Sequence, residues 1–340
     1  MTHTTLADLG WSRAFSSEAE GLPGTPARIT AVHRSLVDTL AETGPLRLAT
    51  PPDTAPLATG DWVLHDGTKV LSLLPRQSAL GRLAAGPEAR EQLIAANVTT
   101  LGIVTSCNAD FNPARLERYL VLASEAGCLP LVILTKADTT ANPRAYVSQA
   151  ERLSPLLTAI ALDATDEDDV ARLAPWCRAG ETLALVGSSG VGKTTLRNAL
   201  TGQSAATQAI REDDAKGRHT TTVRELVPTR HGGWLIDTPG MRAVPLFDVS
   251  DGIAAVFEDI EDLAGSCRFN DCAHDSEPGC AVQAAIAAGD VDPERLKRWR
   301  KLMSEDQRNS ESIAEARARD KGFGRMVKSA MSDKRNRRGD

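Results

Sequence analysis

The sequence has no apolar run near the roughly 18 residues needed to cross a bilayer, and residues 1–25 lack a cationic start followed by an apolar stretch. We therefore expect a cytoplasmic protein without a membrane partner. Positive charge is not in excess either, because 39 Lys and Arg against 45 Asp and Glu leave a net charge of −6. Only residues 290–340 are basic, with 15 Lys and Arg against 10 Asp and Glu. This end either binds phosphate backbones or serves only solubility.

Aromatic residues are scarce, at 4% of the chain. Few side chains can therefore stack on nucleic-acid bases, and within residues 26–75 the main candidate is Trp62. We expect any RNA contact to use charge and shape rather than base reading. The six cysteines do not suggest disulfides, because cytosolic thiols stay reduced unless they bind metal or take part in chemistry. The length of 340 residues suggests about two domains.

Three regions differ in their apolar pattern. Short strand candidates broken by Gly, Pro and an Asp66-Gly67 hairpin signal predict a small β module at 27–34, 45–50, 60–66 and 69–75. From about residue 91, apolar runs alternate with helical patterns, which is typical of a parallel sheet. A helix begins at Asn112-Pro113. The apolar runs lie at 101–106, 131–134, 182–186 and 234–236. After about residue 255 come a Cys/His cluster, an Ala-rich helix ending at Gly289 and a charged helix beginning at Asp292-Pro293.

Residues 187–194, GSSGVGKT, match the phosphate-binding pattern GxxxxGK[ST] between a strand and a helix. The glycines let backbone amides surround a phosphate, and the helix N-terminus adds positive charge. Lys193 would reach the β- and γ-phosphates, and Thr194 would bind Mg²⁺. The alternative is a glycine-rich turn without a ligand. The predicted GTP-binding residues here are Gly187, Ser188, Ser189, Gly190, Val191, Gly192, Lys193, Thr194 and Thr195.

Residues 237–240, DTPG, follow the strand at 234–236. In nucleotide switches this pattern brings an aspartate near the metal and a glycine amide near the γ-phosphate. We therefore predict that Asp237 binds Mg²⁺ and that Gly240 contacts GTP. The same four residues also form an ordinary turn, so the prediction depends on the phosphate loop fifty residues upstream.

Residues 135–138, TKAD, resemble the NKxD box that recognises guanine, with Thr135 in place of the usual Asn. A carboxylate at Asp138 can accept hydrogen bonds from the ring N–H and the exocyclic amine of guanine, and adenine offers no such pair of donors. Lys136 would lie along the base, and we include Ala137 in the loop. The alternative is a helix start after a strand.

The order of these motifs is unusual. In an ordinary GTPase the guanine box follows the phosphate loop, whereas here it precedes both that loop and DTPG. A parallel sheet can be cut and rejoined without changing which strand ends meet at the ligand. The order therefore indicates a circularly permuted GTPase, in which the segment after Asp237 leads toward the C-terminal region.

A second site is indicated near the C-terminus. Cys267, Cys272, His274 and Cys280 supply three thiolates and one imidazole, the ligand set of a closed tetrahedral zinc site. We expect one structural Zn²⁺, which can contribute much of a small module's stability. The alternative is a group of buried thiols without metal.

Together these motifs resemble the ribosome small-subunit-dependent GTPase A (RsgA) family. The resemblance covers about residues 26–305 and rests on the patterns GDWV at 60–63, AANV at 95–98, TKAD, GSSGVGKT, GRHTTT at 217–222, DTPG and the Cys/His cluster. It implies an N-terminal OB-fold β-barrel, a central permuted α/β P-loop GTPase and a mainly helical zinc-binding C-terminal domain. The implied boundaries are 1–25 for an N-terminal extension, 26–89, 90–250, and 251–340 including the basic tail.

The residue after DTPG is Met241, and a thioether cannot orient the attacking water as a glutamine does. His219 is the local candidate for this role, and the family resemblance indicates the same residue. The alternative is a solvated loop histidine. Among the threonines of residues 220–222, we choose Thr221 as a further Mg²⁺ ligand.

We therefore predict a monomeric GTPase that binds GTP and GDP with Mg²⁺ and acts in late maturation of the small ribosomal subunit, contacting its rRNA. Hydrolysis would be stimulated by that subunit. An alternative function is an RNA-associated assembly chaperone that binds GTP and hydrolyses it only incidentally. A third is a P-loop ATPase with a structural zinc ion.

Overall fold

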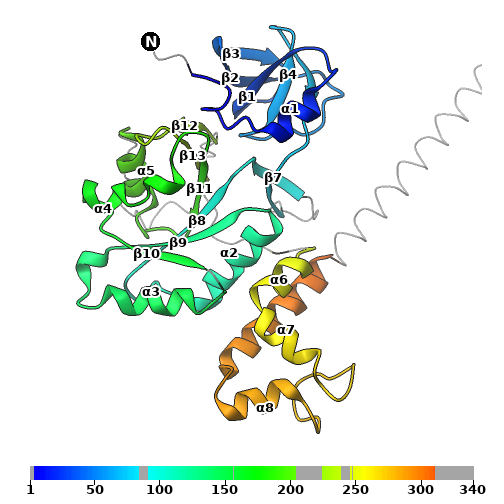
Figure 1. Ribbon diagram of the computed structural model, residues 1–340, viewed down its shortest axis with the longest axis vertical. Coiled ribbons are helices and arrows are strands. Elements are labelled where there is room, and N and C mark those ends of the chain that lie inside the picture. Colours follow the sequence, from blue (N-terminus) through cyan, green and yellow to red (C-terminus); the bar gives the residue numbers. More distant parts are fainter. Residues whose placement is uncertain are drawn as a thin grey trace, which may run out of the picture.

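A computed structural model describes residues 4–83, 91–155, 157–203, 224–238, 246 and 248–310. Three parts follow one another along the chain: a small β-sheet part, a larger sheet flanked by helices, and a group of helices (Figure 1). Within these ranges, no helix is both long and apolar enough to cross a membrane.

The first sheet has five antiparallel strands in the order β3-β2-β1-β4-β5. Its two edge strands also approach each other, because the backbone N–H of Ala49 at the end of β3 donates to the carbonyl of Thr68 just before β5 (2.9 Å). Apolar side chains such as Ile29, Leu48 and Val63 fill the space inside. The strands are β1 (Thr25–Val32), β2 (Leu36–Ala41), β3 (Gly44–Ala49), β4 (Trp62–His65) and β5 (Val70–Leu73).

Four of these five strands confirm sequence predictions. Strand β2 was not predicted, because Asp38 and Thr39 interrupt its apolar pattern. The predicted hairpin between β4 and β5 is confirmed. Asp66 Oδ1 accepts from the backbone N–H groups of Thr68 and Lys69, both at 2.9 Å, and Asp66-Gly67 makes the turn.

The segment before β1 packs against this sheet. It contains α1 (Arg13–Ala19), and the rings of Trp11 and Phe15 lie 4.8 and 5.9 Å from the ring of Trp62. Trp62 is fully buried as a result. Our suggestion that Trp62 could stack on bases is therefore wrong, because three of the chain's few aromatic rings form a core here.

The second sheet has six strands in the order β10-β9-β8-β11-β13-β12, and only β12 is antiparallel. The chain runs outward from β8 to β9 and β10, then returns to β11 on the other side of β8. The carboxyl ends of β8 and β11 therefore border the topological switch point, where open α/β sheets bind ligands. The strands are β8 (Thr100–Ser106), β9 (Leu129–Thr135), β10 (Thr158–Ala161), β11 (Thr182–Gly187), β12 (Leu226–Pro228) and β13 (Trp234–Asp237).

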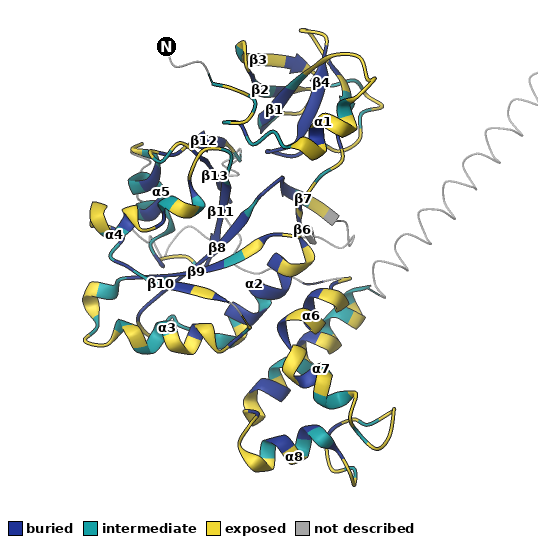
Figure 2. Cartoon of the chain, viewed as in Figure 1, coloured by how far each residue is buried: buried dark blue, intermediate teal, exposed yellow. Residues whose placement is uncertain are grey.

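Helices cover both faces of this sheet (Figure 2). Along β11, Leu183 and Leu185 face the core with α4 and α5, whereas Ala184 and Val186 face the core with α2 and α3. A strand buried on both faces has a continuously apolar sequence. For this reason β8, β9, β11 and β13 were predictable. The short strands β10 and β12 were not predicted. The helices are α2 (Pro113–Glu125), α3 (Pro143–Glu151), α4 (Glu167–Ala171) and α5 (Lys193–Thr201), with 3₁₀ turns η1 (Ala137–Thr139) and η2 (Ala174–Trp176).

The two sheets meet at a buried arginine. Between them lies the hairpin of β6 (Ala79–Leu83) and β7 (Glu91–Ala96). Arg28 of β1 is almost fully buried and donates to Asn97 O (3.0 Å) after β7 and to Thr182 Oγ1 (2.8 Å) at the start of β11. Burial lowers the pKa of Arg28 to about 9, opposed by the charge of Asp61. Arg28 thus joins the first sheet to the amino end of the second.

The C-terminal part consists of α6 (Ser250–Val256), α7 (Glu258–Ala264), α8 (Ala281–Ala288) and a helix that begins at residue 293 and is described to 310. The helices predicted to end at Gly289 and to begin at Asp292-Pro293 are confirmed. Gly289 ends α8 with φ +84°, a left-handed conformation that glycine adopts without strain.

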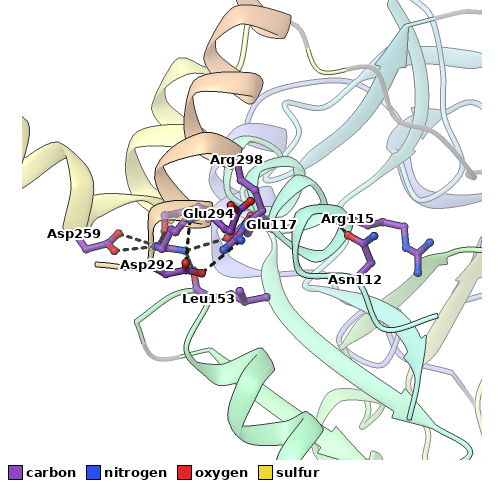
Figure 3. A network of polar contacts seen from close by, with 10 residues as sticks. Asn112, Arg115, Glu117, Leu153, Asp259, Asp292, Glu294 and Arg298 are labelled. Atoms are coloured by element: carbon purple, nitrogen blue, oxygen red, sulfur yellow. Dashed lines mark hydrogen bonds and ion pairs between the residues drawn. The ribbon is translucent and has the colours of Figure 1, made fainter. Parts of the chain in front are cut away.

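A buried carboxylate fixes this part to the second sheet (Figure 3). Glu117 of α2 has no exposed surface. Its two oxygens accept from Arg298 Nε (2.6 Å) and Arg295 Nη1 (3.2 Å) of the helix at 293–310. Arg295 also forms two 2.8 Å contacts with Asp259 of α7. Burial raises the pKa of Glu117, and the two arginines oppose that rise.

The same helix also holds the chain that follows β13. Its Glu305 pairs with Arg118 of α2 (Nη2 to Oε2, 2.6 Å). One turn later, Asn309 Nδ2 donates to the carbonyl of Leu246 (2.6 Å). The helix at 293–310 therefore contacts both α2 and the segment that leads away from Asp237.

We expect Glu117→Ala to lower the free energy of unfolding by about 3–5 kcal/mol, because it leaves two arginines at this interface without their carboxylate. Urea-induced unfolding followed by circular dichroism measures the change. The exposed pair Glu294–Lys297 supplies the control, and Glu294→Ala should cost less than about 0.5 kcal/mol. Equal losses in both variants would contradict this role of Glu117.

Candidate functional site

The glycine-rich loop at 187–192 joins β11 to α5 at the switch point. Gly187 has φ +140°, and a Cβ there would lie 2.1 Å from the carbonyl of Val104 in β8, so only glycine fits. Gly192 caps α5 with no side-chain hydrogen bond, so no cap side chain occupies the amides at this helix N-terminus. Such amides form an anion site.

Lys193 folds back over this loop. Its Nζ donates to the carbonyl of Gly187 (2.8 Å) and to that of Ser188. The ammonium group therefore lies against the first two carbonyls of the loop. The contact with phosphates that the GK[ST] pattern predicts for Lys193 stays a prediction.

The loop at 135–138 touches the glycine-rich loop directly. Thr135 is fully buried, and its hydroxyl donates to the carbonyl of Val191 (2.6 Å). Lys136 Nζ donates to the carbonyl of Gly190 (2.9 Å). The structure thus brings together two loops that the sequence separates by more than fifty residues.

Thr135, which stands in place of the usual Asn, joins the two loops through its hydroxyl. A hydroxyl on a β-branched side chain is shorter than an amide, and the contact is possible because the loop backbone passes close by. A Cβ added to Gly192 would lie only 3.4 Å from Thr135 Oγ1. Asp138 follows in the 3₁₀ turn η1 and is exposed to solvent.

One support of this loop was missed by sequence reasoning. The backbone N–H of Ala137 donates to the carbonyl of Leu162 (3.3 Å), just after β10. No side chain carries this contact, so no residue type could have indicated it. Residues 161–164 could have been linked to this loop only through their position after strand β10. That strand was not predicted.

Asp237 ends β13 beside the same loop. It pairs in register with Leu185 of β11, two residues before Gly187. The hydroxyl of Thr238 donates to the carbonyl of Leu185 (2.5 Å) and fixes the strand end. Burial raises the pKa of Asp237, and the positive charges of Arg197 and Lys193 oppose that rise. Predicted site residues His219, Thr221 and Gly240 lie outside the described residues.

The four predicted metal ligands lie together in the C-terminal part. The ligand atoms of Cys267, Cys272, His274 and Cys280 are all within 4.8 Å of one another. Cys267 Sγ lies 3.9 Å from Cys280 Sγ, and His274 Nδ1 lies 3.5 and 3.6 Å from these two sulfur atoms. Burial raises the pKa of Cys267, but the N–H groups of Ala281 and Val282 outweigh it and lower the pKa overall.

The helix at 293–310 packs against this cluster. The ring of Trp299 meets that of His274 edge to face, with centroids 5.8 Å apart. Arg300 Nη1 pairs with Asp275 (2.7 Å). The helix that contacts α2 therefore also holds the Cys/His loop.

These features define a class: an α/β protein in which the glycine-rich loop at 187–192 contacts the loop at 135–138, with a Cys₃His cluster in a C-terminal helical part. The chain belongs to the RsgA GTPase family, whose model matches residues 73–247. It is therefore a GTP hydrolase, as the sequence predicted.

Relatives with the same family name cover almost the whole chain. A small ribosomal subunit biogenesis GTPase RsgA from Mesorhizobium japonicum is 51% identical over 90% of this chain and 91% of its own length. RsgA 2 from Vibrio parahaemolyticus is 44% identical over 99% and 95%.

Two solved structures have the same fold. YjeQ from Thermotoga maritima matches with a TM-score of 0.61 and 23% identity, over 83% of this chain and 98% of its own. YloQ, described as a circularly permuted GTPase, matches with a TM-score of 0.62 and 22% identity, over 86% and 98%.

We expect Thr135→Val to lower the free energy of unfolding by about 1–2 kcal/mol, because it keeps the side-chain shape but leaves the Val191 carbonyl without its donor. Thr135→Ser retains the hydroxyl and is the matched control; it should lose less than Thr135→Val. Chemical denaturation of the nucleotide-free protein measures both. A larger loss for the serine variant would show that the methyl group, not the hydrogen bond, stabilises this contact.

Proposed function

We propose that this protein hydrolyses GTP to GDP and phosphate in biogenesis of the small ribosomal subunit, and that binding to that subunit stimulates turnover. The process comes from the names of its relatives. The observation that best supports the chemistry is the direct contact of the two loops, through Thr135 with Val191 and Lys136 with Gly190.

In this proposal, residues 187–195 bind the phosphates of GTP. The backbone amides of the loop and the N-terminus of α5 face the phosphate oxygens. Lys193 exchanges its contacts with the Gly187 and Ser188 carbonyls for contacts with the β- and γ-phosphates. Residues 135–138 bind the base, with the exposed carboxylate of Asp138 accepting from the two donors of guanine.

Magnesium would be held by Thr194 and Asp237. Both offer hard oxygen ligands, which Mg²⁺ prefers, and the half-buried carboxylate at the end of β13 lies beside the phosphate loop. The ion would neutralise charge on the phosphates during transfer. We also propose Thr221 as a metal ligand, Gly240 as a γ-phosphate contact and His219 as the group that orients the attacking water, on the sequence argument alone.

We further propose that the five-stranded sheet is an OB-fold over residues 26–89 that contacts rRNA. The approach of Ala49 to Thr68 supports closure of the barrel, because it brings the two edge strands together. Trp62 is buried, so contact through charged side chains such as Arg34 and Arg47 fits better than base stacking. The GTPase core would span 90–250 and the zinc-binding part 251–340.

We place this activity in the cytoplasm, where ribosomal subunits are assembled, and propose a monomer as the active form. The test of the function is GTP turnover by the purified protein alone, with small ribosomal subunits and with large ones. We expect slow turnover alone and a stimulation of about 10³- to 10⁵-fold by small subunits only. Equal rates with and without small subunits would overturn the proposal and favour an assembly chaperone with incidental hydrolysis.

The variant Asp138→Asn tests base recognition separately from GTP turnover. An amide can donate to the 2-oxo group of xanthine, whereas the carboxylate accepts from the 2-amino group of guanine. The ratio of GDP to xanthosine diphosphate affinity should therefore fall by about 10- to 100-fold. An unchanged ratio would contradict the role of Asp138 without contradicting GTP hydrolysis.

For the Cys/His cluster we propose one structural zinc ion. A tetrahedral site with Zn–S and Zn–N bonds of about 2.3 and 2.0 Å has S–S and S–N edges of about 3.8 and 3.5 Å. The separations of 3.9, 3.5 and 3.6 Å among Cys267, His274 and Cys280 fit those edges.

We expect one zinc per chain by elemental analysis, and a lower melting temperature after Cys272→Ser because zinc binding contributes to folding. Cys128→Ser is the control: it removes a buried thiol outside the cluster and should leave the zinc content at about one. Zinc retained at that level by Cys272→Ser, with an unchanged melting temperature, would contradict the assignment.

A further inference from the structure

Helix α5 carries a second cation toward the phosphate loop. Arg197 lies one turn after Lys193, so both side chains leave the same face of the helix. The phosphate-loop pattern includes the lysine and ends before Arg197.

Arg197 is directed at the carboxylate that ends β13. Its Nε lies 3.6 Å from Asp237 Oδ2, and the two side chains are 16% and 31% exposed. This nitrogen is buried and, within the described part of the chain, has no hydrogen-bond partner. The ion pair is therefore close and largely shielded from water, but too long for a hydrogen bond.

The same carboxylate is the one proposed for Mg²⁺. This ion demands near-octahedral geometry, keeps several of its waters and contacts the protein through one or two carboxylates. A guanidinium 3.6 Å from Oδ2 repels the ion and occupies one side of the carboxylate. The metal and Arg197 therefore compete for Asp237.

We propose that Arg197 is a positioning residue that sets the Mg²⁺ affinity of the nucleotide complex by pairing with Asp237. The inference rests on the proposed GTP and Mg²⁺ site. When Arg197 pairs with Asp237, that carboxylate would be less available to Mg²⁺, and the ion would dissociate more readily. Because the ion would neutralise charge on the phosphates beside Asp237, its loss would speed release of GDP.

The consequence would be faster nucleotide exchange at a given Mg²⁺ concentration. Removing the guanidinium should then have an effect that damage to the fold cannot produce, namely tighter metal binding. Tighter metal binding would distinguish competition for Asp237 from a packing role of Arg197 in α5. A packing defect would instead weaken the binding of both nucleotide and metal.

The experiment measures dissociation of a ribose-labelled fluorescent GDP from the full-length protein over a series of free Mg²⁺ concentrations, and in EDTA. For Arg197→Met, which keeps an unbranched chain but removes the charge, we expect the Mg²⁺ midpoint to fall by about fivefold. Arg197→Lys retains a cation and should stay near the wild type. Dissociation in EDTA should be similar for all three proteins.

Arg178→Met is the matched control, because Arg178 is exposed, pairs with Glu181 and lies at the amino end of β11. It should not move the midpoint. An unchanged or higher midpoint for Arg197→Met, or an equal fall in Arg178→Met, would overturn the inference. Failure of the wild type to bind the GDP probe at all would instead overturn the proposed function.

Discussion

The hydrogen bond from the Thr135 hydroxyl to the Val191 carbonyl is the contact on which the site depends. It joins loops 56 positions apart in the sequence, and both partners are buried, so an unmatched carbonyl there would be costly. With Lys136 held by the Gly190 carbonyl, the proposed base-recognition loop takes its position from the glycine-rich loop itself. The distance between the two halves of the proposed nucleotide site is therefore set by these contacts and not by the order of the motifs.

Two buried charges fix the other parts of the molecule around this sheet. Arg28 attaches the first sheet at the amino ends of the strands, beside Thr182. Glu117 attaches the C-terminal helices to the outer face of α2. Buried ion pairs and hydrogen bonds of this kind add little net stability, but they disfavour alternative arrangements because a misplaced charge stays unpaired. Neither the Arg28 contacts nor the Glu117 ion pairs involve residues at the carboxyl ends of β8, β11 and β13.

The permuted order has a mechanical consequence that the contacts make concrete. The chain leaves Asp237, reaches Leu246, and is held there by Asn309 of the helix that also contacts α2 and the Cys/His loop. A change at the end of β13 is therefore close, along the chain, to the element that carries the proposed zinc site. The C-terminal part is thus joined to the end of β13 by a short stretch of sequence and by polar contacts of one helix.

Much of this could be predicted from local patterns. The phosphate loop, Asp237, residues 135–138 and the four Cys/His ligands each depend on a short spacing, because their chemistry requires residues that are near one another in the sequence. The buried strands β8, β9, β11 and β13 were also predictable, since strands covered on both faces are continuously apolar. What only the tertiary structure decided concerns distant pairs. Thr135 could replace an asparagine only because the Val191 carbonyl lies close to it, and Trp62 is a core residue only because other segments cover it. The backbone support from Leu162 and the approach of Arg197 to Asp237 are of the same kind. All four depend on distances between segments, which no local pattern encodes.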